Sequence, residues 1–515
     1  MSALGERVER PSSWRPGPGE NDRLSGRLTS ALSNVDLPQL LLLAVLLRLA
    51  VMTVATPVHP DEVFQYLEPA HRLLFGQGVI TLEWRSAMRG WMLPLLVSVP
   101  MKVGASLAPD SALYLILPNL VMVAVSLTTV LGAWSLGERI SRLHAQVAGF
   151  VAATWYEFIY FAPHVMSETA SIALILPAAL LLLDRDRWTG LRLAFAAALL
   201  ANAAAIRFQH LPAIGTLVVA CCVSDVRRSW RPLLLGGLVG LAPSIICDLA
   251  MGGVPFAWIL ENFRVNIGHG LAARFSSSGP LGYFDLAWPR LALWSIPLLA
   301  LAGLGARRYP ALAWTAGVNL IFHSAIAHKE YRFILLSVVI AVLLAAIGAV
   351  DWARAVERRD GVEAGRRKLR LLCVAWVLAS VSCSFGGFHT QWMKLRPEMD
   401  LYGRLRSDPS LCGLAVYRHH FTMTGGYTYL HRASPMLYFT TDDRARPGAD
   451  LAQNADAFNT IMTPPRYGPE LPAAFKPADC EGSAGSRVCL YRRPGPCTDT
   501  GGRFAINAVL RRTAE

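Results

Sequence analysis

The sequence predicts an all-α membrane protein with many transmembrane helices, followed by a small C-terminal domain. Only 17% of the 515 residues are charged and 53% are hydrophobic, whereas soluble domains carry about 25% charged residues. Apolar runs recur along the chain, and about 17 residues or more suffice to cross the hydrocarbon core. The net charge of +13 fits arginine clusters in cytoplasmic loops. No aromatic platform accompanies these residues, so we expect no nucleic-acid partner.

Eleven apolar segments are expected to span the membrane. They are 38–56, 112–136, 146–163, 167–183, 191–206, 208–224, 233–250, 288–305, 310–327, 333–350 and 371–387. The segment 91–108 is also apolar, but it carries Pro94, Pro100 and Lys102. We therefore expect it to form a re-entrant or interfacial helix.

The distribution of basic residues sets the expected topology. Residues 1–37 are polar and arginine-rich and lack a cleavable signal peptide, so we expect a cytoplasmic tail. The loop at 351–370 is the richest in Arg and Lys, as cytoplasmic loops are. Counting 91–108 as a span would place the later basic loops outside. We therefore expect a transmembrane domain at 38–387, whose first outer loop is 57–111.

The tail 388–515 is expected to be a small α/β or mainly β domain on the outer face. Turn signals such as "TGGY" alternate there with apolar runs such as "CGLAVY" and "MLYFTT". Its four cysteines suggest disulfides in an oxidising compartment. Cys480 and Cys489 bracket a plausible turn, and Cys412 could reach Cys497. Free thiols are the alternative, and the spacings match no common zinc site.

The stretch "HPDEVFQYLEP" at 59–69 places acids where the chain leaves the first span. Carboxylates beside lipid are costly unless they are paired or functional. The alternative is a solvated loop in which Asp61 caps a helix that starts at Glu62. Downstream, "TLEWRSAMRGWMLP" adds Glu83, Trp84 and Arg89. These residues could instead belong to an interfacial amphipathic helix.

A second polar group, "AHKEYRFI" at 327–334, lies between two spans with almost no loop. Lys329 and Arg332 at an outer surface would suit a phosphate group. The alternative is a charged hairpin tip. Glu168 starts one span and Arg207 ends another, and each alone is more often a helix-end anchor. Together these residues predict one polar ring on one membrane face.

These motifs resemble those of the polyprenyl-phosphate-mannose-dependent mannosyltransferases. Residues 59–94 are similar to the family's first outer loop, and "HKEYRF" is similar to its usual HKEERF signature. Tyr331 stands where relatives have an acid, so we expect Tyr331→Glu to be tolerated. The GPI mannosyltransferase III type is the most similar, followed by the N-glycan α-1,2 enzymes. The loop "NIGHGLAARFSSSGPLGYFDL" departs from the family pattern, which puts acceptor contacts there in doubt.

The resemblance implies a GT-C-like bundle of about 11 helices and an inverting transfer of mannose, with α-1,2 linkage. The donor would be polyprenyl- or dolichyl-phosphate-mannose in the lipid bilayer, and the acceptor a mannoside or glycolipid; neither a metal nor a cofactor is expected. The implied catalytic base is Asp61, with Glu62 second. The residues expected at the donor phosphate are Lys329, Arg332, His328 and Glu330. The other expected substrate-binding residues are His59, Gln65, Glu83, Trp84, Arg89, Glu168 and Arg207.

Three other functions are alternatives to mannose transfer. A GT-C transferase of another sugar would share the topology. A secondary transporter would show paired repeats and broken helices near the midplane, whereas the polar residues here gather at one face. A structural subunit would have lost Asp61 or Arg332. The membrane is expected to be bacterial with the site facing the periplasm, or that of the endoplasmic reticulum with the site facing the lumen.

Overall fold

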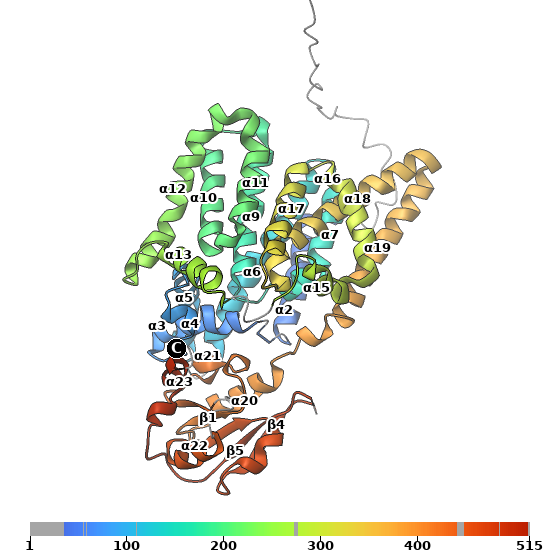
Figure 1. Cartoon of the computed structure of the whole chain (residues 1–515). Helices are drawn as coiled ribbons and strands as arrows, with labels where there is room; N and C mark the ends of the chain where they lie inside the picture. The colour runs from blue at the N-terminus through green and yellow to red at the C-terminus, as the bar shows by residue number, and fades with distance from the viewer. Residues whose placement is uncertain are drawn as a thin grey trace, which may run out of the picture.

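In the computed structural model, helices form a long bundle and a small sheet domain lies at one end of it (Figure 1). The structure describes residues 35–54, 56–57, 59–109, 111–271, 277–439, 447–483 and 485–512. Most of the expected cytoplasmic tail, residues 1–34, therefore lies outside the described residues. The short helices α3 (Glu68–Phe75) and α4 (Leu82–Arg85) lie between the bundle and the sheet domain.

The bundle is built from helices joined by short links. Their bounds are α2 Leu37–Met52, α5 Met92–Leu107, α6 Leu113–Glu138, α7 Arg142–Thr154, α8 Tyr156–Tyr160, α9 Ser167–Leu183, α10 Gly190–Ile206, α11 Leu211–Cys222, α12 Val226–Ala250, α13 Ala257–Phe263, α15 Gly282–Leu291, α16 Ser295–Ala306, α17 Pro310–Ala325, α18 Leu335–Asp360 and α19 Val362–Phe385. Helix α10 packs between α9 and α12, α6 packs against α5 and α7, and α16 packs against α18. One large apolar core runs through these helices.

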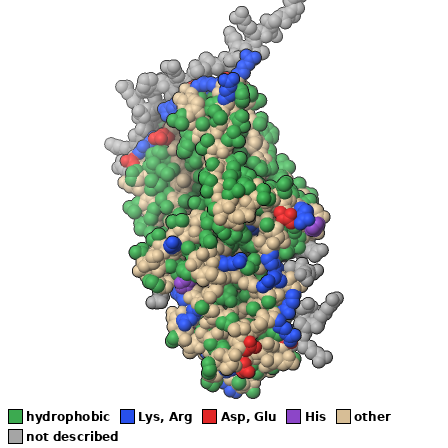
Figure 2. Space-filling model, turned by 90° about the vertical axis from the view of Figure 1, so that its left-hand side faces the viewer, with side chains coloured by type: hydrophobic (Ala, Val, Ile, Leu, Met, Phe, Trp, Pro, Cys, Tyr) green, Lys and Arg blue, Asp and Glu red, His purple; other side chains and the backbone are tan. Residues whose placement is uncertain are grey.

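Five helical segments of the described residues are long and apolar enough to cross a membrane. They are Leu113–Glu138, Phe208–Ala250, Gly282–Ala306, Tyr331–Asp360 and Val362–Phe385, and the shorter apolar helices are α2, α5, α9 and α10. Figure 2 shows a broad surface of hydrophobic side chains over the helices. The chain is thus a multi-pass membrane protein. The count of eleven spans, and the interfacial placement of α5, stay predictions.

The predicted span 146–163 is wrong as a continuous helix. Helix α7 ends at Thr154, and Trp155 is extended, with φ −69° and ψ 126°, before α8 begins. The last carbonyls of α7 have no partner within their own helix. Arg48 of α2 donates to two of them, with 3.3 Å to the Ala152 oxygen and 3.4 Å to the Ala153 oxygen. The isolated arginine of the first span therefore caps a broken helix.

The basic segment 351–370, predicted to link the last two spans, consists of two helix ends that meet at Gly361. Helix α18 continues to Asp360 and α19 begins at Val362. The segment is rich in Ala, Glu, Arg and Lys, which favour helices even where they are too polar for lipid. Gly361 alone breaks the helix, with φ +93°, a conformation that glycine adopts at little cost.

The C-terminal domain is α/β, one of the two predicted alternatives. Helix α20 (Arg396–Arg406) precedes a five-stranded sheet whose strand order is β2-β1-β3-β5-β4. The strands are β1 Leu414–Tyr417, β2 Met436–Phe439, β3 Thr460–Thr463, β4 Lys476–Glu481 and β5 Val488–Arg492. Strands β2, β1 and β3 are parallel, whereas β5 runs antiparallel to β3 and β4. Short helices α21 (Gly426–Leu430), α22 (Pro447–Gln453) and α23 (Ile506–Arg512) complete the domain.

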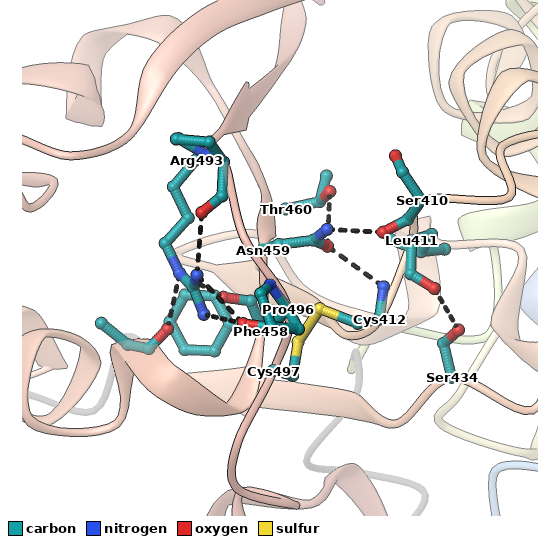
Figure 3. The surroundings of a disulfide bond; sticks show 12 residues. Ser410, Leu411, Cys412, Ser434, Phe458, Asn459, Thr460, Arg493, Pro496 and Cys497 are labelled. Atoms are coloured by element: carbon teal, nitrogen blue, oxygen red, sulfur yellow. Dashed lines mark hydrogen bonds between the residues drawn. A yellow bond between two sulfur atoms is a disulfide. The ribbon is translucent and has the colours of Figure 1, made fainter.

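The structure pairs the four cysteines of this domain in the two ways named above. Cys480 and Cys489 lie opposite each other on β4 and β5 and form one disulfide. Cys412 and Cys497 form the other. Around the second disulfide, Asn459 accepts a hydrogen bond from the Cys412 amide at 3.2 Å and lies next to the bridge (Figure 3). The disulfide thus ties the last segment of the chain to the start of the sheet.

Candidate functional site

The first part of the predicted outer loop folds into one helical segment with Asp61 at its start. A π-helix, η1, covers Glu62–Leu67, and α3 continues it over Glu68–Phe75. All residues of η1 are buried. π-helical turns are rare and often occur at functional sites. The Asp61 side chain makes no capping hydrogen bond, so the capping interpretation is wrong.

Asp61 instead forms ion pairs with two arginines, Arg332 and Arg89, and accepts a hydrogen bond from Arg332. Its Oδ2 atom lies 2.8 Å from Nη2 of Arg332 and 3.6 Å from Nη2 of Arg89. His59 Nδ1 lies 3.6 Å from the Oδ1 atom. Burial alone would raise the pKa of Asp61, but Arg332, His59 and Arg89 outweigh burial and hold the pKa well below its usual range. Asp61 is therefore ionised throughout the neutral range.

Glu168 joins Arg332 to a third arginine. The Glu168 Oε1 atom lies 3.1 Å from Arg332 Nη1 and 3.1 Å from Arg207 Nη1. Glu330 pairs with Arg332 as well, with 2.5 Å between Oε2 and Nε. The result is a continuous chain of charges in which Arg332 contacts three carboxylates. A buried arginine needs such partners, because leaving it unpaired would be costly.

The "HKEYRF" segment is not an exposed hairpin tip. Arg332 is only 7% exposed and Tyr331 6%. His59 Nε2 lies 3.2 Å from Glu330 Oε2, and His328 Nε2 lies 2.9 Å from Glu330 Oε1. The two predicted motifs therefore meet directly at this glutamate.

Glu62 lies beside Asp61 but faces another part of the protein. Its carboxylate lies 3.0 Å from His164 Nδ1 and accepts from the Val165 amide at 3.0 Å. Both contacts hold the turn between α8 and α9. Glu62 therefore fits a structural role better than that of the reacting base.

A small cavity adjoins the charge chain. Its lining includes the expected residues Gln65, Arg89 and Arg207, together with Trp258 and Asn262 on α13. Asn262 Nδ2 donates to the Met88 oxygen at 3.4 Å, which holds α13 over the loop. Glu83 and Trp84 do not line this cavity; the Trp84 ring instead packs against Trp91, with 4.5 Å between ring centroids.

Several buried nitrogen donors of this lining have no hydrogen-bond partner among the described residues. They are the Nε atoms of Arg89 and Arg207 and the indole Nε1 of Trp258. Buried donors are normally paired, so unpaired ones at a cavity indicate a place for an acceptor group. A phosphate or sugar oxygen has this character.

Comparisons with known proteins identify the family. A model described as the Alg9-like mannosyltransferase family matches residues 39–402, which is most of the chain and includes both motifs. The chain belongs to this family. GPI mannosyltransferase 3 of Yarrowia lipolytica is 27% identical over 407 residues, covering 76% of this chain and 74% of that protein. GPI mannosyltransferase 3 of Trypanosoma brucei brucei is 26% identical, covering 75% and 76%.

Solved structures agree with the family at the level of the fold. The crystal structure of ArnT from Cupriavidus metallidurans bound to undecaprenyl phosphate has a TM-score of 0.54 and 11% identity. It covers 88% of this chain, and this chain covers 97% of it. The chain therefore shares the fold of this structure, and its family makes it a mannosyltransferase.

Lys329 of this mannosyltransferase does not join the charge chain. Its ammonium group donates to the backbone oxygens of Ser324 at 2.9 Å and Ile326 at 2.5 Å. It also lies 5.5 Å from the centroid of the Tyr283 ring. Lys329 thus closes the end of α17, and the cation at the centre of the site is Arg332.

Sequence reasoning missed Glu157, which lies beneath the second motif of the mannosyltransferase. Glu157 is fully buried, and the Tyr331 hydroxyl donates to its Oε1 atom. Trp155 Nε1 donates to Oε2 at 2.8 Å, and the Arg290 guanidinium lies 4.5 Å from the centroid of the Tyr331 ring. An acid within the apolar run 146–163 was the available signal. The contact also argues against the expected tolerance of Tyr331→Glu, because two carboxylates would then meet.

Proposed function

We propose that this mannosyltransferase transfers mannose from a polyprenyl- or dolichyl-phosphate-mannose donor to a mannoside or glycolipid acceptor. The transfer inverts the anomeric configuration and forms an α-1,2 linkage. The linkage is supported by a relative in Bos taurus, GPI alpha-1,2-mannosyltransferase 3, which is 27% identical over 300 residues. A lipid-phosphate donor is supported by the undecaprenyl phosphate bound to ArnT.

The observation that carries the proposal is the meeting of Asp61 with Arg332. The acceptor hydroxyl needs a base within hydrogen-bond reach, and the leaving phosphate needs a cation as its charge grows. Our candidates for these two roles are Asp61 and Arg332, and the 2.8 Å between Asp61 Oδ2 and Arg332 Nη2 supports the pairing. We assign Asp61 as the general base, and Glu62, bound to His164 and Val165, as a support for the loop.

We assign the donor phosphate to Arg332, Arg89 and Arg207. Two of these arginines retain unpaired Nε donors at the cavity, and Arg presents a planar fork that suits phosphate oxygens. Binding would draw Arg332 and Arg89 away from Asp61. Since these guanidiniums hold the pKa of Asp61 down, donor binding would make the carboxylate more basic when the acceptor needs it.

The remaining expected site residues take supporting roles in this proposal. Glu330 and His328 fix Arg332 and His59 through their mutual contacts. Glu168 holds Arg207 and Arg332 at a common distance. We place this cluster, with the disulfide-bonded C-terminal domain, on the non-cytoplasmic side of the membrane.

The test is to incubate the purified enzyme with radiolabelled polyprenyl-phosphate-mannose and a panel of mannoside acceptors, and then to map the linkage. Asp61→Asn should lower turnover by about 10²–10⁴-fold while donor binding persists. The matched control is Asp360→Asn, which changes an exposed aspartate at the end of α18 and should leave turnover unchanged. Full turnover in Asp61→Asn would contradict the assignment of the base.

A further inference from the structure

The C-terminal domain contacts the first outer loop at four successive places. The Phe64 ring packs edge-on against Phe421, with 5.4 Å between centroids. Glu68 binds the Thr428 amide, and His71 Nε2 lies 3.1 Å from His431 Nδ1. Asn507 accepts from the Ile80 amide at 2.7 Å and donates to the Gly78 oxygen at 2.9 Å. The contacts follow the loop from η1 to the turn after α3.

Glu68 is the centre of this interface. It is 0% exposed, and its two oxygens accept separate backbone amides. Oε2 accepts from Val79 of the same loop at 2.6 Å, and Oε1 accepts from Thr428 of the C-terminal domain at 2.7 Å. One carboxylate thus joins two segments that are 360 residues apart.

The other side of the interface is shaped to fit this carboxylate. Gly426 has φ +57°, and a Cβ atom there would lie 2.0 Å from Glu68 Oε1. Only a glycine allows α21 to approach so closely. Tyr114 of α6 donates to the Thr428 oxygen at 2.5 Å, so α21 is held from the bundle as well as from the loop.

The same helical segment carries Asp61 at one end and Glu68 seven residues later. The helix is continuous over η1 and α3 and has no break between the two acids. Because the helix is continuous, holding Glu68 in place also sets the position and direction of the Asp61 side chain. An error of about 1 Å in a reacting group can lower the rate by about 10²-fold.

We propose that the C-terminal domain is part of the catalytic machinery: by holding Glu68, it positions the helix that presents Asp61. Glu68 is thus a positioning residue that acts through Asp61. This inference rests on the proposed role of Asp61 as the base. A domain that only stabilised the fold would instead affect the amount of folded enzyme and leave the turnover of each molecule unchanged.

The test uses Gly426→Ala and Glu68→Gln in the full-length enzyme. Gly426→Ala inserts a methyl group against the carboxylate, and Glu68→Gln replaces one acceptor oxygen by a donor amide at nearly constant shape. The matched control is Gly502→Ala. Gly502 also has positive φ and lies in the same domain, but nothing lies within 4 Å of the added Cβ.

Two readouts separate positioning from folding. We expect turnover per folded molecule to fall by about 10–10²-fold in Gly426→Ala and Glu68→Gln, with little change in donor KM. Hydrogen exchange of residues 59–75 should become faster in both, and Gly502→Ala should match the wild type. The double variant should be no worse than the more impaired single variant, because both changes disrupt one contact.

Wild-type turnover in both single variants would overturn the inference, as would unchanged exchange of 59–75. If Gly426→Ala fails to fold, Glu68→Gln alone decides the question by the same two readouts. Asp61→Asn, measured in the same assay, separates the two proposals. Full activity of Asp61→Asn would contradict the role of Asp61 as the base. Faster hydrogen exchange of residues 59–75 in Glu68→Gln would still show that the C-terminal domain stabilises the loop.

Discussion

Arg332 and Asp61 are 271 residues apart in the sequence, yet Nη2 of one lies 2.8 Å from Oδ2 of the other. Arg332 follows the link between α17 and η7 (Tyr331–Ile334), and Asp61 precedes η1. The ion pair therefore joins the first outer loop to the start of α18. Both halves of the transmembrane domain have to be in place before this contact can form.

Arg332→Lys should impair the enzyme far more than a substitution that conserves charge normally does. A lysine offers one compact charge, whereas the Arg332 fork contacts Asp61, Glu168 and Glu330 at once. We expect turnover to fall by about 10²-fold and donor KM to rise. A donor titration measures both. Arg359→Lys, an exposed control on α18, should behave as wild type; equal kinetics for Arg332→Lys would contradict the phosphate role.

Tyr331→Glu should destabilise the protein, although the HKEERF signature that this motif resembles has an acid at this position. The new carboxylate would be buried close to Glu157, which now accepts from the Tyr331 hydroxyl. Tyr331→Phe should cost about 1–3 kcal/mol, because Glu157 loses a buried donor. Combining Tyr331→Glu with Glu157→Gln should restore part of the loss. Thermal unfolding in detergent measures all of these variants, and a Tyr331→Glu enzyme as stable as wild type would refute the contact.

The stability that Glu68 contributes to the folded protein should fall as pH rises from about 4.5 to 7. Burial raises the pKa of Glu68 to about 7, so the folded state binds a proton more tightly than the unfolded state. The stabilisation is complete below the unfolded pKa and is lost as pH rises through the folded pKa. At about 1.4 kcal/mol per pKa unit, the loss in the free energy of unfolding reaches about 3 kcal/mol.

Comparing the wild type with Glu68→Gln separates the pH dependence caused by Glu68 from that of the other titratable groups at the interface. The nearby phenols of Tyr114, Tyr402 and Tyr427 titrate above this range. Burial lowers the pKa of His71 to about 4, which gives the opposite pH dependence in both proteins. The difference in unfolding temperature between wild type and Glu68→Gln should therefore change between pH 5 and 8. A constant difference would contradict the pKa of Glu68.

The four cysteines of the C-terminal domain should be oxidised in the mature protein. Alkylation without reductant, followed by mass spectrometry, should leave Cys412, Cys480, Cys489 and Cys497 unmodified. Replacing the Cys412–Cys497 pair by serines should cost more stability than replacing the other pair. The partners of the first disulfide are 85 residues apart in the sequence, and those of the second are 9 apart. Closing the longer loop removes more chain entropy from the unfolded state.

The clustering of polar side chains could be predicted from the sequence because it follows from a few physical rules. Buried charges need partners, and alternating spans with basic inner loops bring Asp61, Glu168, Arg207 and Arg332 to one side. The structure brings these four residues together. The sequence also predicted a separate domain after α19, and four of its five strands lie in short apolar runs between turn signals, whereas β4 (Lys476–Glu481) is polar.

Other features depend on packing between segments that no local pattern connects. The role of Glu157 depends on Tyr331, 174 residues later, and that of Glu68 on Thr428. The helix breaks at Trp155 without a proline or glycine that would predict the break. The last carbonyls of α7 accept hydrogen bonds from Arg48 of another helix. The predicted basic link 351–370 consists of two helix ends, which the residue types of this segment favour.

The crowding of carboxylates around Arg332 has a consequence for selectivity. A membrane enzyme that binds a lipid phosphate is surrounded by anionic headgroups that carry the same chemical group. An ordinary lipid headgroup would have to replace the ion pairs that Arg332 already forms with Asp61, Glu168 and Glu330. Its single phosphate would form no stronger contacts than the ones it replaced. If Arg332 binds the donor phosphate as proposed, we expect only a ligand that contacts the site with both its sugar and its phosphate to replace these ion pairs, so that bulk lipid is kept out.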